Sequence, residues 1–412
     1  MSTHTTHHES LFRHTGWAFW PIAFIARLPF AMMTVGVLTL VASATASVEL
    51  AGLTSAAVGI GVVVAGPAIG SLADRFGQRA VLIPIGIANA LLLGAFPFLL
   101  VGGASEAVTL ALALAIGLTA PQAAAMSRSR LLTLVRARLH PDTRERAISR
   151  VQSYESAADE TAFVIGPFLV GILAAAIAPW APIALAAVLA LIFVTAFALH
   201  PTATVAAEAE NDVLPAPMLE VLRGRVLVLV AATFAVDAFF GATLTSLTAF
   251  AQQFGDEAIA GLLYGLMGLG SAALALGVAL LPARFTLRAR WLAFAAVMLL
   301  SAVAYAAVTG LGAMIAALLL MGLGVGPTLV TLFSLAGART PRGRSATTMT
   351  LLGSALVLAQ ALAAAVTGWI AENVSLAAAM ALPAVAASVV VVLGAVNVWG
   401  SRRAVAAARA AS

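Results

Sequence analysis

The sequence contains no cysteine and no lysine. Without cysteine, disulfide bonds, thiolate nucleophiles, iron–sulfur clusters and zinc sites with cysteine ligands are excluded. Without lysine, the chain cannot encode the Gly-x-x-x-x-Gly-Lys phosphate loop of ATP-driven pumps. All 22 basic residues are therefore arginines, a bias that no single site explains physically.

Charge of either sign is also scarce. Charged residues are 9% of the 412 residues and hydrophobic residues are 62%, whereas a soluble domain is about 25% charged. The mean hydropathy of +1.04 is not balanced by a polar domain. Because the arginines lie between apolar runs, the isoelectric point near 10.8 does not indicate a nucleic-acid partner. The composition predicts a protein whose solvent is the lipid bilayer.

Twelve apolar runs are long enough to cross a membrane, since about 20 helical residues span about 30 Å of hydrocarbon. The first has no small-residue cleavage site before a soluble domain, so we expect it to be retained. We predict an all-α membrane protein of two six-helix bundles, 19–199 and 226–399, with a hydrated linker at 200–225 and tails at 1–18 and 400–412. The runs are 19–46, 53–73, 80–102, 105–126, 152–177, 180–199, 226–250, 258–281, 288–309, 311–335, 346–370 and 375–399.

The arginines segregate to one side of the predicted membrane. Every arginine except Arg27 falls in a terminus or in alternate loops, and short arginine-rich loops stay cytoplasmic. We therefore predict that both termini are cytoplasmic. The opposite loops hold acids and no arginine, namely Glu49, Glu106, Asp256, Glu257 and Glu372.

The two halves share a Gly-Pro segment. The fourth run contains Gly117-Leu-Thr-Ala-Pro121, and the tenth contains Gly322-Leu-Gly-Val-Gly-Pro327, about half the chain later. This offset indicates an internal duplication, and transporters commonly place their substrate site between such repeats.

The turn between the second and third runs carries the most specific motif. A glycine-rich basic turn alone can be an ordinary helix connection. Together with twelve runs in two sets of six, however, it resembles the signature loop of the major facilitator superfamily, and the resemblance covers the chain apart from its tails. The signature positions that the sequence fills are Gly70, Asp74, Arg75, Gly77 and Arg79.

The resemblance implies that this turn is a cytoplasmic gate. The carboxylate of Asp74 would bind basic neighbours and the positive N-terminus of a helix in the other half when the cytoplasmic side is closed. We expect that helix to be the eleventh, which begins near Ser345. The equivalent turn of the second half, at 277–285, has no acid, so one such latch is expected.

The fifth run is similar to the antiporter motif of the superfamily's drug exporters at Gly166, Pro167 and Gly171. The match is partial, because Ser153 and Ala162 replace glycines of that motif. Small residues here can equally serve close helix packing, and a proline kinks the helix under either interpretation. The resemblance is greatest to bacterial proton-coupled exporters and implies a multi-pass protein of the inner membrane.

Ionisable side chains inside a span cost at least about 2.5 kcal/mol each, so they are functional candidates. Arg27 lies at the depth of Asp159, which predicts an intramembrane ion pair with Asp159 or Glu160, either static or taking part in transport. Asp237 has no cation at its depth in its own half, and by resemblance its helix faces a central cavity. Asp237, Asp159 and Glu160 are therefore proton-coupling candidates. Asp237 can alternatively be a cavity-lining polar residue or contact Arg27.

All six histidines lie in tails or loops, which excludes a histidine relay across the membrane. We expect no metal site and no cofactor, and we interpret His4, His7 and His8 as part of a solvated tail. The remaining cavity candidates are few, mostly neutral and partly soft, which favours an amphipathic or hydrophobic solute over a sugar or an anion. They are Met32, Met33, Gln122, Phe239, Thr243, Thr328, Thr331 and Gln360.

The sequence therefore favours a secondary active transporter, not an enzyme, because no catalytic constellation is visible. The leading hypothesis is proton-coupled export of a small amphipathic or hydrophobic solute by alternating access, carried out by a monomer. One alternative is a uniporter or proton symporter of a small metabolite such as a sugar or organic acid. A second is a non-transporting membrane receptor or scaffold.

Overall fold

The computed structural model describes residues 11–45, 47–211, 215–252, 258–282 and 284–410. Within these ranges the chain is helical and forms no strand. The described residues form twelve helical spans that are long and apolar enough to cross a membrane, as predicted. The predicted tail residues His4, His7 and His8 and the loop acids Asp256 and Glu257 lie outside the described residues.

The first six spans contain several interrupted helices. The first, fourth and sixth spans are each built from more than one helical segment, and the others are single helices. In chain order they are α2 (Phe19–Ile25) with α3 (Leu28–Thr45), α4 (Val48–Phe76), α5 (Gln78–Val101), α6 (Glu106–Leu118) with α7 (Ala123–Arg138), α8 (Pro141–Ala176), and α9 (Ala181–Leu189) continued by the π-helical turn η1 (Ala190–Val194) and α10 (Thr195–Leu199).

The second six spans are more regular. Short helices also lie before the first span, in the linker and after α14: α1 (Leu11–Thr15), α11 (Thr202–Asn211), α12 (Met218–Val221) and the 3-10 turn η2 (Val278–Leu280). The spans are α13 (Gly224–Gln252), α14 (Ala258–Gly277), α15 (Leu287–Ala306), α16 (Leu311–Arg339), α17 (Ser345–Asn373) and α18 (Leu376–Ala410).

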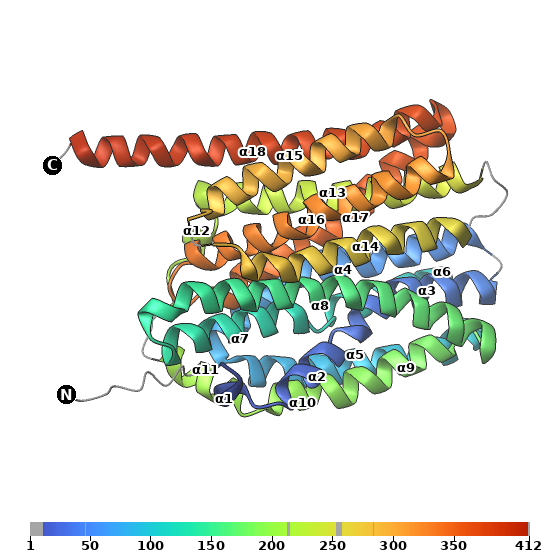
Figure 1. Ribbon diagram of the computed structural model, residues 1–412. Helices are drawn as coiled ribbons and strands as arrows, with labels where there is room; N and C mark the ends of the chain where they lie inside the picture. Colours follow the sequence, from blue (N-terminus) through green and yellow to red (C-terminus); the bar gives the residue numbers. More distant parts are fainter. Residues whose placement is uncertain (1–10, 46, 212–214, 253–257, 283, 411–412) are drawn as a thin grey trace.

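The helices lie side by side in one elongated bundle, with α1 and the end of α18 toward the same end (Figure 1). The second-half helices occupy the upper part of the view and the first-half helices the lower part. The halves meet where α4 packs against α17 and α8 packs against α14. We call the end that contains the α4–α5, α7–α8 and α16–α17 connections the arginine-rich end.

The predicted runs 105–126 and 152–177 leave 127–151 outside the fourth and fifth spans, but most of that segment is helical. Helix α7 continues to Arg138 and α8 begins at Pro141, where proline suits the first helical turn. Arg128 and Arg130 are consequently buried inside the bundle, with 1% and 0% of their surface exposed. The apolar residues at 131–135, which follow these arginines and are almost completely buried, carry the helix onward.

The linker is also more ordered than a hydrated connection. Its helix α11 packs against α7 and α5. Arg130 anchors this region, because it donates hydrogen bonds to the hydroxyl of Thr202, the first residue of α11 (3.2 Å), and to the carbonyl of Phe197 in α10 (2.8 Å). Burial and the neighbouring Arg130 lower the pKa of His200, which lies between α10 and α11.

Candidate functional site

Asp74 joins the two halves at the arginine-rich end. It lies in the last turn of α4 and accepts hydrogen bonds from the backbone N–H groups of Ala346 and Thr347, both at 2.8 Å. The hydroxyl of Thr347 also donates to it. These residues form the first turn of α17, so the carboxylate caps the positive end of that helix. Asp74 therefore contacts the eleventh span, α17, as the sequence predicts.

Close packing of α4 on α17 depends on Gly70. A Cβ atom at this position would lie 2.1 Å from Thr350 Oγ1 and 2.8 Å from the Cα of Thr347. Gly77 completes the turn into α5 with a φ of 83°, a conformation that favours glycine. Arg75 and Arg79 are exposed at the surface.

A second set of hydrogen bonds joins the two halves near the same end. Gln152 of α8 donates to the carbonyl of Phe333 in α16 at 3.0 Å. Arg136 of α7 donates to the carbonyl of Gly337, one turn further along α16. The halves are therefore held together at the arginine-rich end by α4–α17 and by α7 and α8 against α16.

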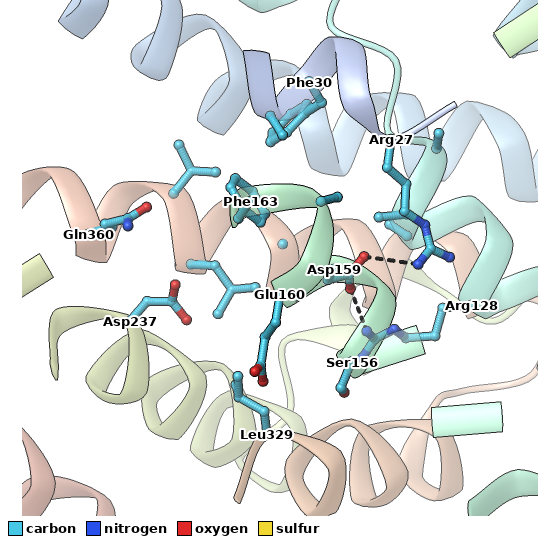
Figure 2. A pocket seen from close by; sticks show the side chains of 18 of the residues that line it. Arg27, Phe30, Arg128, Ser156, Asp159, Glu160, Phe163, Asp237, Leu329 and Gln360 are labelled. Atoms are coloured by element: carbon cyan, nitrogen blue, oxygen red, sulfur yellow. Dashed lines mark hydrogen bonds and ion pairs between the residues drawn. The ribbon is translucent and has the colours of Figure 1, made fainter. Parts of the chain in front are cut away.

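A four-residue charge cluster lies deeper in the bundle. Arg27 Nη2 lies 2.6 Å from Glu155 Oε2, and its Nη1 lies 3.3 Å from Asp159 Oδ1. Arg128 Nη2 lies 2.6 Å from the other oxygen of Asp159 (Figure 2). The hydroxyl of Ser127 donates to Glu155 at 2.9 Å. Two cations and two carboxylates balance, so the cluster has no net charge when all four groups are ionised.

The cluster contains one of the two predicted partners of Arg27. Asp159 pairs with Arg27, but no ion pair links Glu160 to either arginine among the described residues. Glu155 and Asp159 are one helical turn apart and share a face of α8. Glu160 follows Asp159 directly, so it points about 100° away around the helix axis. Its carboxyl group therefore faces a different neighbourhood.

The helix break at Arg27 explains its position. Helix α2 ends at Ile25 and α3 begins at Leu28, with Pro29 in its first turn. Proline is tolerated at the start of a helix but interrupts one that precedes it. Arg27 sits in this short break and is 3% exposed.

A cavity of about 170 Å³ lies between the two halves beside the charge cluster. Helices α3, α7 and α8 of the first half line it together with α13, α14, α16 and α17 of the second. Arg27, Arg128 and Asp159 border it, and most of the remaining lining is apolar. Its aromatic side chains are Phe30, Phe163, Phe240, Tyr264 and Phe333.

Two further acids line this cavity, Glu160 on α8 and Asp237 on α13. Figure 2 shows Glu160 pointing away from the arginines, on the side of the cavity toward Asp237. Asp237 Oδ2 is buried without a hydrogen-bond partner in the described part of the chain. The Glu160 carboxyl group is also buried, and the polar group beside it is the hydroxyl of Ser271. No arginine forms an ion pair with either acid among those residues. The cavity is thus bordered by a balanced charge cluster and by two acids without an ion pair in the described part of the chain.

Of the eight neutral cavity candidates, Gln122 and Gln360 line the cavity. The other six are not among the residues that line it. Met32 and Met33 pack in the first-half core, and Phe239 packs in the second-half core. The remaining three bond backbone carbonyls of their own helices at 2.7 Å, a local use of threonine hydroxyls that the sequence does not reveal: they are Thr243, Thr328 and Thr331.

Sequence analysis missed Arg128, Phe163, Phe240 and Tyr264 in this lining. A signal existed for Phe240, which follows Asp237 by three residues and so shares its helix face. For Arg128, the signal was the apolar sequence after it, which shows that the helix does not end there. For Tyr264 and Phe163 we find no comparable signal in the sequence.

Of the antiporter-like residues, Gly166 lies at a close helix contact. Helix α8 passes unbroken through Pro167. A Cβ atom at Gly166 would lie 2.8 Å from the Cβ of Ala31, so this glycine brings α8 close to α3. Gly171 has no neighbour within 4 Å of that position. No group of three potential metal ligands occurs among the described residues.

Comparisons with known proteins give one family and one shared fold. The model of the Major Facilitator Superfamily matches residues 19–355. A search of curated proteins finds no significant match. Similar crystal structures include the human organic anion transporter MFSD10 (TETRAN), with a TM-score of 0.70 and 17% identity over 93% of this chain and 99% of that one.

Two further structures show the same fold. A bacterial homologue of the iron transporter ferroportin, in its outward-facing state, has a TM-score of 0.74 and 17% identity over 92% of this chain and 98% of that one. The proton:xylose symporter XylE has a TM-score of 0.67 and 14% identity over 92% and 95%. At identities this low, the structural likeness shows that the fold is shared and nothing more.

Proposed function

The chain belongs to the major facilitator superfamily and is a membrane transporter, not an enzyme, and we propose that it exports a small amphipathic solute in exchange for protons. It acts as a monomer in a bacterial inner membrane, with both termini and the arginine-rich end in the cytoplasm. The cavity between the halves is the solute site, and Glu160 and Asp237 are the proton-coupling pair.

The observation that carries this proposal is that neither acid forms an ion pair among the described residues. Arg27 and Arg128 are matched by Glu155 and Asp159, which leaves no arginine for Glu160 or Asp237 among the described residues. A carboxylate in an apolar cavity is costly unless it carries a proton or faces a cation. If protonation of these acids changes the affinity for the solute, solute binding changes the affinity for the proton by the same factor.

The arrangement of the halves supports alternating access. The contacts of Asp74 with α17 and of α7 and α8 with α16 close the arginine-rich end. Opening that end requires these contacts to separate while others form at the opposite end, as two bundles rock around a central site. The aromatic lining suits an apolar body better than a sugar, which needs many hydrogen-bond partners.

The test uses purified protein in liposomes that contain a pH-sensitive dye. Lipophilic cations, neutral drugs, sugars and organic acids are added in turn under an imposed proton gradient, with protein-free liposomes as the control. Proton movement on adding an amphipathic compound is the expected result. Equilibration of a compound without proton movement would instead establish a uniporter, and no flux of any compound would favour a receptor or scaffold.

Asp74→Asn is expected to slow exchange about fivefold while solute affinity stays unchanged. The amide keeps the side chain's shape but loses the charge at the α17 N-terminus, which is worth about 1 kcal/mol. Initial rates in liposomes and equilibrium binding in detergent measure the two quantities separately. Asp142→Asn, at an exposed acid on the same end of the molecule, is the matched control. A variant that no longer binds solute contradicts the latch.

A further inference from the structure

The fourth span is broken where it passes the cavity. Helix α6 ends at Leu118 and α7 begins at Ala123, with Pro121 between them. Proline lacks an N–H group and disfavours a helical conformation in the residue before it. The related segment of the second half contains Pro327, yet α16 runs through it without interruption. The break thus distinguishes the fourth span from its repeat.

The break directs a helix N-terminus at the cavity. No side chain caps α7, and the first backbone hydrogen bond of this turn runs from Met126 N to Gln122 O. The preceding N–H groups of Ala123, Ala124 and Ala125 therefore have no intrahelical acceptor. All three residues line the cavity. A helix start with free N–H groups and a partial positive charge favours an anion.

Two buried side chains add donors to the same lining. Gln122 is 6% exposed and Arg128 is 1% exposed, and both border the cavity. Gln122 Nε2 and Arg128 Nη1 have no hydrogen-bond partner in the described part of the chain. Arg128 is held in place, since its Nη2 binds Asp159 and its guanidinium lies 3.5 Å from the centre of the Phe333 ring. Buried donors are normally paired, so these indicate a ligand that supplies acceptors.

We propose that the α6–α7 break is a carboxylate-binding subsite, with Gln122, the α7 N-terminus and Arg128 as donors to the solute. A carboxylate supplies two oxygens and several acceptor positions, which matches a group of convergent donors. This inference rests on the proposed transport function and narrows it to solutes that carry a carboxylate on an apolar body. The aromatic side chains contact that body, and Glu160 and Asp237 remain on the other side of the cavity.

The subsite can be tested by equilibrium binding without a proton gradient. The probes are phenylpropanoate and phenethylamine, which have similar aromatic bodies and carry a carboxylate and an amine respectively. Isothermal titration of purified wild-type protein is expected to detect phenylpropanoate. Gln122→Glu is nearly isosteric and places an acid at a helix start, which favours folding. It should weaken phenylpropanoate binding at least about tenfold by like-charge repulsion and leave phenethylamine binding undiminished.

A second variant separates charge from hydrogen bonding. Gln122→Met removes the amide without adding charge and should weaken phenylpropanoate binding about threefold to tenfold. Absence of phenylpropanoate binding to the wild type, or equal binding to wild type and Gln122→Glu, would overturn the subsite. Binding that is sensitive to Gln122→Glu supports it even when liposomes show no proton movement. In that case proton-coupled export fails and the carboxylate subsite stands.

Discussion

Asp237→Asn is expected to reduce proton-driven exchange about a hundredfold or more while the protein stays folded, inserted and able to bind solute. Asparagine has nearly the shape of aspartate but cannot take up and release a proton, and loss of a proton-transfer group costs about this much. Asp237 is half-buried on α13 and lines the cavity. No arginine pairs with it among the described residues. The substitution therefore leaves no cation stranded.

Two rates in the same liposomes separate coupling from movement of the bundles. Exchange driven by a proton gradient should disappear in Asp237→Asn, whereas solute-for-solute exchange without a gradient should continue. Glu372→Gln, at an exposed acid of the same half, should leave both rates unchanged. If gradient-driven exchange persists in Asp237→Asn, proton coupling belongs to Glu160 or Asp159, and Glu160→Gln becomes the variant to measure.

The contact between the Asp74 turn and α17 was predictable from sequence because its signals are local. The motif around Asp74 specifies a tight turn, and a helix that begins after Arg344 offers a positive N-terminus to a carboxylate. Twelve spans followed from the length of apolar runs alone. The contact between Asp74 and Ala346 then needed no knowledge of how any helix rotates about its axis.

The cavity lining was less predictable because it depends on helix rotation and on where helices end. Thr328 and Thr331 looked available, yet their hydroxyls bond their own backbone. Adjacent acids on α8 separated into different environments, with Asp159 among the arginines and Glu160 beside the second half (Figure 2). Arg128 was assigned to a loop because the apolar count stops at Met126. The apolar residues that follow Arg130 indicate instead that the helix continues past Met126.

Arg128→Met is expected to lower the free energy of unfolding by about 3–5 kcal/mol, the cost of removing one partner from a buried ion pair. Asp159 would keep only its 3.3 Å contact with Arg27 among its ion pairs in the described chain, and Glu155 competes for that cation. Two carboxylates would then share one guanidinium in a site where Glu155 is fully buried. Unfolding of purified protein in mixed micelles, followed by circular dichroism, measures the loss.

The double variant Arg128→Met with Asp159→Asn distinguishes charge balance from packing. It returns the cluster to one cation and one carboxylate, Arg27 and Glu155 at 2.6 Å, and should recover more than half of the lost stability. Arg146→Met, at an exposed arginine of α8, controls for loss of a guanidinium as such and should change stability by less than about 0.5 kcal/mol. If the double variant is no more stable than Arg128→Met, the stacking of Arg128 on Phe333 accounts for the loss, and the four charges do not form one energetic unit.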